Sequence, residues 1–286
     1  MSTIWRLTAF ADFKTLADAL ERLDEAYPPV ALSWLLFDDG PGARMDVLFE
    51  TKPDEAAFRE VSGLAGDIAM VVEPMPDEDW VRISLEGLKP VEAGRFVLFG
   101  AHDRDTVAPG LIELEIEAGP AFGTGHHGTT RGCLIAFDEM LTAGFAPKTV
   151  FDLGCGTAAL AIAAAKVLPE AEVIASDIDP EAVEESAENC TKNGTPEIEC
   201  FVAEGLDHER LAGRQFELIF ANILAGPLVE LAPGIANALT PGGRVILSGL
   251  LTEQEAWVRA AYEAAGLAVH RQPPLEGWET LVATRA

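Results

Sequence analysis

A short glycine-rich segment contains the residues that most clearly point to chemistry. Asp152 and Leu153 end an apolar run, Gly154-Cys155-Gly156 follows, and an alanine-rich run comes next. This order predicts a buried strand, a tight turn and a helix, an arrangement in which backbone approaches a ligand closely beside a helix N-terminus. We therefore expect a cofactor to bind at Gly154 and Gly156.

The acidic residue before this turn helps to identify the cofactor. With Ala159 as the last position, the segment also satisfies the loose dinucleotide pattern, so glycine spacing alone leaves a nicotinamide or flavin cofactor open. A carboxylate at Asp152 would lie near an anionic pyrophosphate, and like charges ~4 Å apart repel by roughly 4 kcal/mol at an effective dielectric constant near 20. The same carboxylate suits the ammonium and sulfonium groups of S-adenosylmethionine, which we expect as the cofactor.

A second carboxylate ends the next predicted strand. Asp177 stands where a side chain can accept hydrogen bonds from the two hydroxyls of a cofactor ribose. Its alternative role, as the acid that begins the following helix, suits Asp179 better, because Pro180 comes next and favours the first helical turn. Asp177 is therefore a candidate cofactor ligand.

Residues 121–130 (AFGTGHHGTT) form a second cluster, ahead of a predicted helix at about residues 131–141. The side chains of two adjacent histidines diverge, so we expect no metal site. Thr129 or Thr130 could simply cap the helix by accepting hydrogen bonds from its free N–H groups. Because a cap alone does not require the three nearby glycines, we interpret the segment as a loop and helix N-terminus folded over the cofactor.

A third cluster follows the predicted strand at residues 216–221. Asn222 stands at the end of this strand, where its side-chain carbonyl can accept a hydrogen bond from a substrate N–H. The alternative is that Asn222 only caps the next helix. No residue stands out as a general base, so Asn222 is the catalytic candidate, acting by positioning an amine.

These clusters require a sheet whose strands end at one edge. From Lys148 onward, apolar strands and helices alternate, with strands predicted at about 149–153, 172–177, 198–203, 216–221, 243–249, 267–271 and 279–284. The alternation predicts an open α/β sheet, mostly parallel, with helices on both faces.

The first 74 residues predict a separate, smaller domain. Strands at about 4–10, 30–37, 45–50 and 67–72 and helices starting near Phe13 and Asp54 give the order β-α-β-β-α-β, which is the ferredoxin-like α+β plan. Residues 75–94 have the proline-rich, acidic composition of a linker. We therefore expect a substrate-recognition domain at residues 1–74, a linker at 75–94 and a cofactor-binding domain at 95–286.

Charge and composition limit the partners. The 286 residues include 47 Asp or Glu and 20 Lys or Arg, a formal net charge of −27. The acidic excess is spread along the chain and argues against nucleic-acid binding, which depends on clustered cations. It serves either solubility or attraction of a basic partner.

Composition also predicts the compartment. No apolar run reaches the roughly 18 residues of a membrane span, the N-terminus lacks the plan of a signal peptide, and the four cysteines form no CxxC pair. We expect a cytoplasmic protein with reduced thiols and no membrane contact. The sequence has no obvious apolar interface, so we expect a monomer.

Several segments together resemble the ribosomal protein L11 methyltransferases, the PrmA family. The similar segments are residues 121–130, 151–167, 176–194, 220–233 and 247–254, in the family's order. The resemblance implies a class I methyltransferase fold with a Rossmann-like sheet and S-adenosylmethionine as the cofactor. It also implies methylation of lysine side chains, and of an N-terminal amine, of protein L11 of the large ribosomal subunit, docked by a mobile N-terminal domain.

By position, the family's cofactor contacts fall on Thr130, Gly154, Asp177 and Asn222, and its loop histidine falls on His127, with Thr124 in the same loop. Gly128 stands where the family usually has proline, which predicts a more flexible loop. Ser84 replaces an aromatic residue that is usual in the family, and residues 100–102 (Gly-Ala-His) replace a usual Pro-Ser-Trp. Both departures concern the hinge between the domains. The alternatives are a class I methyltransferase for another amine or a nucleobase, a nicotinamide-dependent dehydrogenase, or a non-catalytic binding module.

Overall fold

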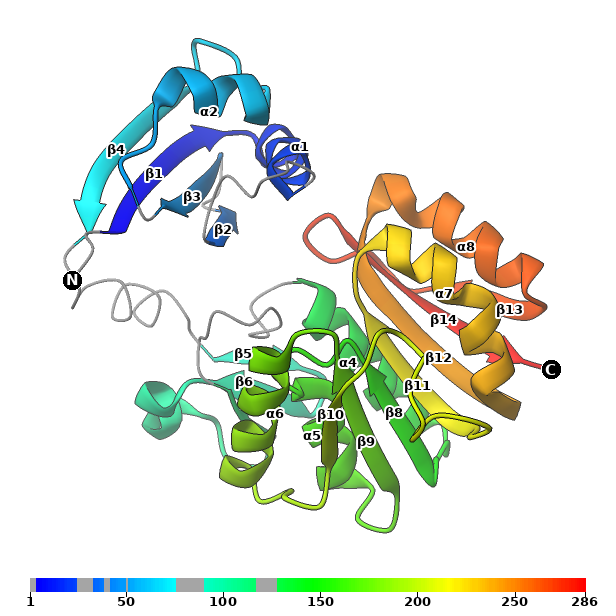
Figure 1. Cartoon of the computed structure of the whole chain (residues 1–286). Coiled ribbons are helices and arrows are strands. Elements are labelled where there is room, and N and C mark those ends of the chain that lie inside the picture. The colour runs from blue at the N-terminus through cyan, green and yellow to red at the C-terminus, as the bar shows by residue number, and fades with distance from the viewer. Residues whose placement is uncertain (1–3, 25–32, 39–41, 50, 76–89, 117–127) are drawn as a thin grey trace. The chain divides into compact units, whose positions relative to one another are not determined.

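The computed structural model describes residues 4–24, 33–38, 42–49, 51–75, 90–116 and 128–286. The chain divides into two compact units, Met1–Glu86 and Gly87–Ala286 (Figure 1). Most of the predicted linker, residues 76–89, lies outside the described residues.

The first unit has the predicted ferredoxin-like order of elements. They are β1 (Ile4–Ala11), α1 (Phe13–Asp24), β2 (Ser33–Asp38), β3 (Ala43–Phe49), α2 (Glu55–Ser62) and β4 (Ala69–Met75). The strands form an antiparallel sheet in the order β2-β3-β1-β4. Alternate residues of β1, such as Leu7 and Ala9, are buried against Leu16 and Leu20 of α1. Leu7 and Ala9 are two residues apart and therefore lie on the same face of the strand.

Helix α2 begins just after Asp54, where the sequence predicts its start. The side chain of Asp54 accepts hydrogen bonds from the backbone N–H groups of Ala56 and Ala57 at the start of the helix. At the other end, Gly63 adopts a φ of 69° and its N–H donates to the carbonyl of Arg59. This left-handed glycine ends the helix at Ser62.

The second unit has a small sheet and a large one. Its elements are β5 (Val91–Ala93), β6 (Phe96–Phe99), the 3-10 helix η1 (Ala101–Thr106), β7 (Ile112–Glu115), α4 (Gly128–Thr142), β8 (Thr149–Leu153), α5 (Ala159–Val167), β9 (Glu172–Asp177), α6 (Pro180–Lys192), β10 (Glu199–Val202), β11 (Phe216–Asn222), α7 (Ala225–Ala238), β12 (Leu239–Leu251), the 3-10 helix η2 (Thr252–Gln254), α8 (Glu255–Ala264), β13 (Leu267–Arg271) and β14 (Trp278–Arg285). Strands β5, β6 and β7 form the small sheet, and the other seven form the large one.

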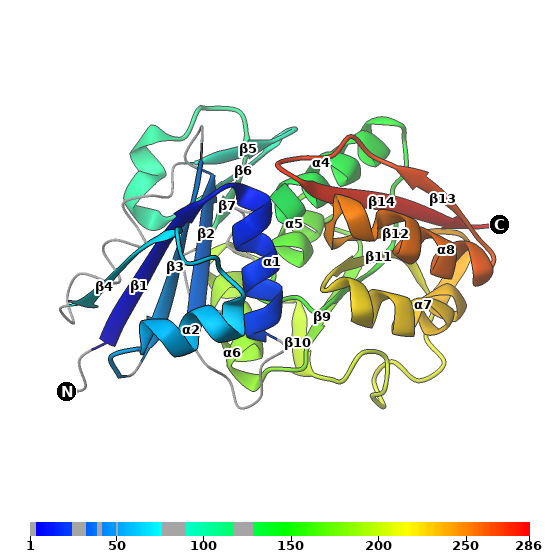
Figure 2. The ribbon, with the colours of Figure 1, turned by 90° about the horizontal axis from the view of Figure 1, so that it is seen from above.

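The large sheet has the strand order β10-β9-β8-β11-β12-β14-β13. Strands β8 to β12 pair in parallel, whereas β14 runs antiparallel to both β12 and β13. Helices α4 and α5 pack on one face and α7 and α8 on the other (Figure 2). The strand order reverses between β8 and β11, and ligands of open α/β sheets bind at the carboxyl ends of the strands beside such a reversal.

Both faces of the central strands are buried, which explains their continuous apolar composition. In β11, Phe220 packs on the side of α4 and α5, while Ile219 packs on the side of α7 and α8. The ring of Phe137 from α4 meets that of Phe220 at a centroid distance of 5.3 Å. This contact fixes α4 over the strands whose ends carry the predicted site.

Two predicted boundaries in this unit are wrong. Helix α4 begins at Gly128, three residues before the predicted start at Arg131. Strand β12 begins at Leu239, which pairs with Phe216, and the register of pairing shifts before Arg244. The strand therefore includes turn-forming residues, from which the sequence predicts a later start at about residue 243. Among the described residues, no helix is both long and apolar enough to span a bilayer.

Candidate active site

The glycine turn has the backbone geometry that its sequence predicts. Gly154 and Gly156 follow β8 with φ angles of 70° and 53°, a region that glycine adopts without steric cost. Ala158 also adopts a positive φ, 60°, and occupies the N-cap position of α5. The N–H groups of Gly154 and Cys155 both donate to the carbonyl of Ser176 in β9, at 2.8 and 2.9 Å. The turn is thereby held across the ends of β8 and β9.

Ile223 lies against two glycines from neighbouring strands. A Cβ atom at Gly154 would lie 2.3 Å from Cγ2 of Ile223, and one at Gly249 would lie 2.3 Å from the carbonyl oxygen of Ile223. The ends of β8, β11 and β12 therefore approach too closely for a side chain at either glycine. This packing places Asn222, the residue before Ile223, beside the glycine turn.

Asp177 connects the turn to the end of β9. Its Oδ2 atom accepts a hydrogen bond from the N–H of Gly156 at 2.9 Å, and its Oδ1 atom accepts one from the N–H of Asp179 at 3.1 Å. Each carboxylate oxygen has a further lone pair for a ligand hydroxyl. The helix start belongs to Asp179, whose side chain accepts from the N–H of Glu181 with Pro180 in the first turn, as predicted.

Asp152 is buried, with 1% of its surface exposed. Its Oδ2 atom accepts a hydrogen bond from the N–H of Ala161 in α5 at 3.0 Å. Burial raises the pKa of Asp152 from 3.8 to about 8, so the carboxyl group is mostly protonated at neutral pH in the protein alone. A nearby cation would favour the ionised form and lower this pKa.

Asn222 and Thr130 join the end of β11 to the first turn of α4. The Nδ2 atom of Asn222 donates to Oγ1 of Thr130 at 3.2 Å. The alternative role of Asn222 as a helix cap is wrong, because α7 starts at Ala225 and the residue in its N-cap position is Leu224. Thr129 and Thr130 are not caps either, since both lie within α4.

Two buried polar atoms at this place have no hydrogen-bond partner among the described residues. They are Oδ1 of Asn222 and Oγ1 of Thr129. A buried polar group that lacks a partner costs about 1–3 kcal/mol, which a ligand can recover by binding there. Together with the glycine turn, these atoms fit a ligand that carries hydrogen-bonding groups, and the carboxyl group of Asp152 suits a positive charge on it.

A polar row that sequence reasoning missed lies beside this site on β12 and β14. Ser248 donates to the carbonyl of Glu279 at 2.9 Å and lies 3.4 Å from the hydroxyl of Thr280. A Cβ atom at Gly132 would lie 2.2 Å from Oγ1 of Thr280, so α4 packs directly on β14. The row supports the first turns of α4, which carry Thr129 and Thr130.

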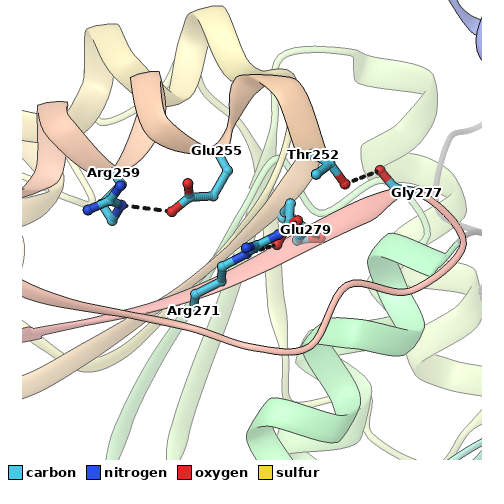
Figure 3. Close-up of polar contacts among 7 residues, drawn as sticks. Thr252, Glu255, Arg259, Arg271, Gly277 and Glu279 are labelled. Atoms are coloured by element: carbon cyan, nitrogen blue, oxygen red, sulfur yellow. Dashed lines mark hydrogen bonds and ion pairs between the residues drawn. The ribbon is translucent and has the colours of Figure 1, made fainter.

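The carboxylate of Glu279 is fully buried and binds Arg271 on the neighbouring strand β13 (Figure 3). The Nε atom of Arg271 donates to Oε2 of Glu279 at 2.8 Å, and its Nη2 atom donates to Oε1. Figure 3 also shows Glu255 paired with Arg259 in α8. The Arg271–Glu279 pair holds β13 and β14 together at the edge of the sheet.

Two predicted cofactor residues, Thr124 and His127, lie outside the described residues. The structure brings the other six, Asp152, Gly154, Gly156, Asp177, Asn222 and Thr130, to the carboxyl ends of β8, β9 and β11 and the start of α4. Their roles as ligands remain predictions.

The reversal of strand order, the glycine turn after β8 and the acid at the end of β9 define a Rossmann-like fold of the class I methyltransferase type. A solved structure of ribosomal protein L11 methylase from Lactobacillus delbrueckii subsp. bulgaricus is similar, with a TM-score of 0.60 and 27% identity over 69% of this chain and 98% of that one.

Sequence comparison identifies the family. The profile of the ribosomal protein L11 methyltransferase (PrmA) family matches residues 41–286. A ribosomal protein L11 methyltransferase of Brucella suis is 49% identical over 82% of each chain, and one of Bradyrhizobium diazoefficiens is 49% identical over 85% of this chain and 84% of its own. The chain belongs to the ribosomal protein L11 methyltransferase family.

Proposed function

We propose that this chain transfers methyl groups from S-adenosylmethionine to amines of ribosomal protein L11, namely lysine side chains and the N-terminal α-amine. Membership of the family supports both the reaction and the protein substrate. The observation that carries the proposal is the buried Oδ1 atom of Asn222, which lacks a partner among the described residues and lies at the strand end beside the glycine turn.

Six described residues would hold the cofactor. The backbone of Gly154 and Gly156 forms the turn around it, Asp177 accepts hydrogen bonds from the ribose, and Asp152 provides a negative charge for its cationic part. Thr130 and Asn222 border it from α4 and β11. When bound, S-adenosylmethionine supplies a methyl group on a positively charged sulfur.

The acceptor amine must be neutral to use its lone pair. A lysine with a pKa of about 10.4 costs about 4.6 kcal/mol to deprotonate at pH 7. Removal from water lowers this cost, because burial disfavours the charged amine. The Oδ1 atom of Asn222 then accepts a hydrogen bond from the amine N–H and directs the lone pair toward the methyl group. The chain thus acts through positioning, without a dedicated base.

We assign substrate docking to the N-terminal domain, predicted at residues 1–74, which is joined by a linker at 75–94 to the cofactor-binding domain at 95–286. The net charge of −27 suits a basic ribosomal protein and opposes direct nucleic-acid binding. We further propose that the protein is a cytoplasmic monomer.

The direct test incubates the chain with S-adenosylmethionine labelled on its methyl group and with separated proteins of the large ribosomal subunit. We expect the label on L11, on lysine residues and the N-terminal amine. Label on another protein, with none on L11, would reassign the substrate. A thermal shift caused by NAD and not by S-adenosylhomocysteine would instead support a dehydrogenase.

A further inference from the structure

Helix α6 and its C-cap residue, Asn193, carry three buried or half-buried polar side chains on one side. Ser186, Asn189 and Asn193 are spaced by three and four residues, so they lie along one side of the helix. Ser186 is fully buried and Asn189 is 1% exposed. Apolar side chains are the usual residues at such positions, so these polar side chains need a specific explanation.

Ser186 and Asn189 donate hydrogen bonds to the glycine turn. The Oγ atom of Ser186 donates to the carbonyl oxygen of Gly156 at 2.7 Å, and the Nδ2 atom of Asn189 donates to the carbonyl oxygen of Thr157 at 3.2 Å. Ser186 also lies 3.3 Å from the sulfur of Cys155. Two consecutive carbonyl groups of the turn are therefore bound to one helix face.

Gly156 is held from two sides. Its N–H donates to Asp177 at 2.9 Å, while its carbonyl accepts from Ser186. Glycine has the largest backbone freedom of any residue, and its φ of 53° here is one of several accessible values. The two hydrogen bonds select one orientation of the peptide groups on either side of Gly156. A turn already in its binding conformation loses less entropy when a ligand binds.

Asn193 extends the contact to the small sheet. Its Oδ1 atom accepts from the N–H of Glu115 at 2.9 Å, and its Nδ2 atom donates to the carbonyl of Glu115 at 2.7 Å. Glu115 is the last residue of β7. Helix α6 therefore binds the glycine turn, and its C-cap residue binds the end of β7, which fixes the helix position relative to the turn.

We propose that Ser186 and Asn189 are positioning residues that hold the glycine turn in its cofactor-binding conformation. This inference rests on the proposed function, because it concerns the affinity for S-adenosylmethionine and its product. Neither residue needs to touch the cofactor. Each acts through the carbonyl group that it binds.

The test compares Ser186→Ala and Asn189→Ala with the wild-type chain. We expect each substitution to raise the Kd for S-adenosylhomocysteine, measured by calorimetry, and the KM for S-adenosylmethionine by about tenfold. The kcat at saturating cofactor should change by less than about twofold. In the double variant, the increase in Kd should be smaller than the product of the single effects, since both residues hold one turn.

Thr195→Val is the matched control. Thr195 is also buried, and its hydroxyl donates to the carbonyl of Cys190 at 3.2 Å, near the end of α6 and away from the turn. The control should lower the melting temperature and leave the Kd for S-adenosylhomocysteine unchanged. If the control and the two alanine variants change the Kd equally, the side chains are merely structural and the proposal is wrong.

Ser186→Cys covers the case in which the alanine variants do not fold. It retains a small side chain of the same shape and weakens the donor, so the Kd, measured with a reducing agent that prevents a disulfide with the nearby Cys155, should rise by a few-fold; an unchanged Kd would overturn the proposal. The wild-type measurement distinguishes a wrong cofactor from a wrong positioning role. If the wild-type chain does not bind S-adenosylhomocysteine, the proposed cofactor is wrong. If it binds and the variants bind equally well, only the positioning role is wrong.

Discussion

The amide of Asn222 donates to the hydroxyl of Thr130 at 3.2 Å, and this bond leaves the other end of the amide, Oδ1, buried without a partner among the described residues. Because the two ends of an amide differ in chemistry, a donor bond on Nδ2 determines where the acceptor oxygen lies. Thr130 therefore orients the group that we assign to the substrate amine.

Asn222→Ala should lower kcat by about 100-fold, because it removes an acceptor that orients the amine in the transition state. The Kd for S-adenosylhomocysteine should change much less. Asn237→Ala, an exposed asparagine near the end of α7, is the control and should leave both values unchanged. Full turnover by Asn222→Ala, with normal cofactor binding, would exclude the proposed role of Asn222.

The raised pKa of Asp152 predicts that stability depends on pH. The carboxyl group stays protonated up to about pH 8 when folded, but ionises near 3.8 when unfolded. Its contribution to the stability of the ligand-free protein is therefore complete below the unfolded pKa and is lost as the pH rises through about 8. Melting temperatures from acidic to mildly alkaline pH should decline less steeply in Asp152→Asn than in the wild type; equal slopes would contradict this prediction.

The same carboxyl group predicts how cofactor affinity depends on pH. If the cationic part of the ligand lies beside Asp152, the ligand binds the ionised form best, so binding releases a proton. The affinity for S-adenosylhomocysteine should then increase with pH, by at most about tenfold per pH unit, and level off above about pH 8. Asp152→Asn should remove this dependence, as calorimetry at several pH values would test.

Gly128→Ala should destabilise the protein by about 1–3 kcal/mol, although alanine favours helices, because its Cβ would lie 2.6 Å from the carbonyl oxygen of Leu275. The backbone at position 128 or at Leu275 must move to relieve that contact. Gly66→Ala is the control, since no atom other than those of its own chain neighbours lies within 4 Å of its Cβ and its φ lies outside the left-handed region, and it should stabilise by up to about 1 kcal/mol. Urea unfolding measures both; equal changes would disprove the steric explanation.

Arg271→Met should lower the melting temperature several times more than Lys192→Met. The first substitution leaves the fully buried carboxylate of Glu279 without its cation. The second breaks an exposed pair in α6, between Lys192 and Glu188, whose atoms are 4.0 Å apart. Comparable shifts in the two variants would show that Arg271 contributes little to the edge of the sheet.

Added salt should weaken the binding of L11 if the acidic surface attracts this substrate, because exposed charges are screened within about 10 Å at 0.1 M salt. The apparent KM for L11 should then rise with salt, while the Kd for S-adenosylhomocysteine stays nearly constant. A KM that does not depend on salt would mean that the acidic excess serves solubility alone.

The sequence predicts the elements of both units well, because their strands and helices have clear hydrophobic periodicity, and it identifies the glycine turn because glycines cluster there. It does not predict the start of α4. Gly128, the first residue of this helix, packs on the backbone of Leu275, which lies far along the chain. Pairwise contacts of this kind leave no local pattern.

The same limit explains why the sequence does not predict the roles of Ser186 and Asn189. Ser186 and its acceptor, the carbonyl of Gly156, are 30 residues apart, and that acceptor is a backbone atom that any residue would provide. The only available signal was polar side chains on a helix face that ought to be apolar. Similarly, Ser248 and Thr280 meet only because β14 pairs with β12.

The contacts of Ile223 determine which substitutions homologous chains can tolerate. At position 249 the obstacle is the backbone of residue 223, so no exchange of the side chain at 223 can make room, and glycine should be invariant there. At position 154 the nearest obstacle is Cγ2 of Ile223, a branch that leucine or alanine would lack. A relative with a larger residue at position 154 would therefore need an unbranched Cβ at position 223 and would still have to adopt the positive φ of 70° there, which strains a side chain, so such exchanges should be rare.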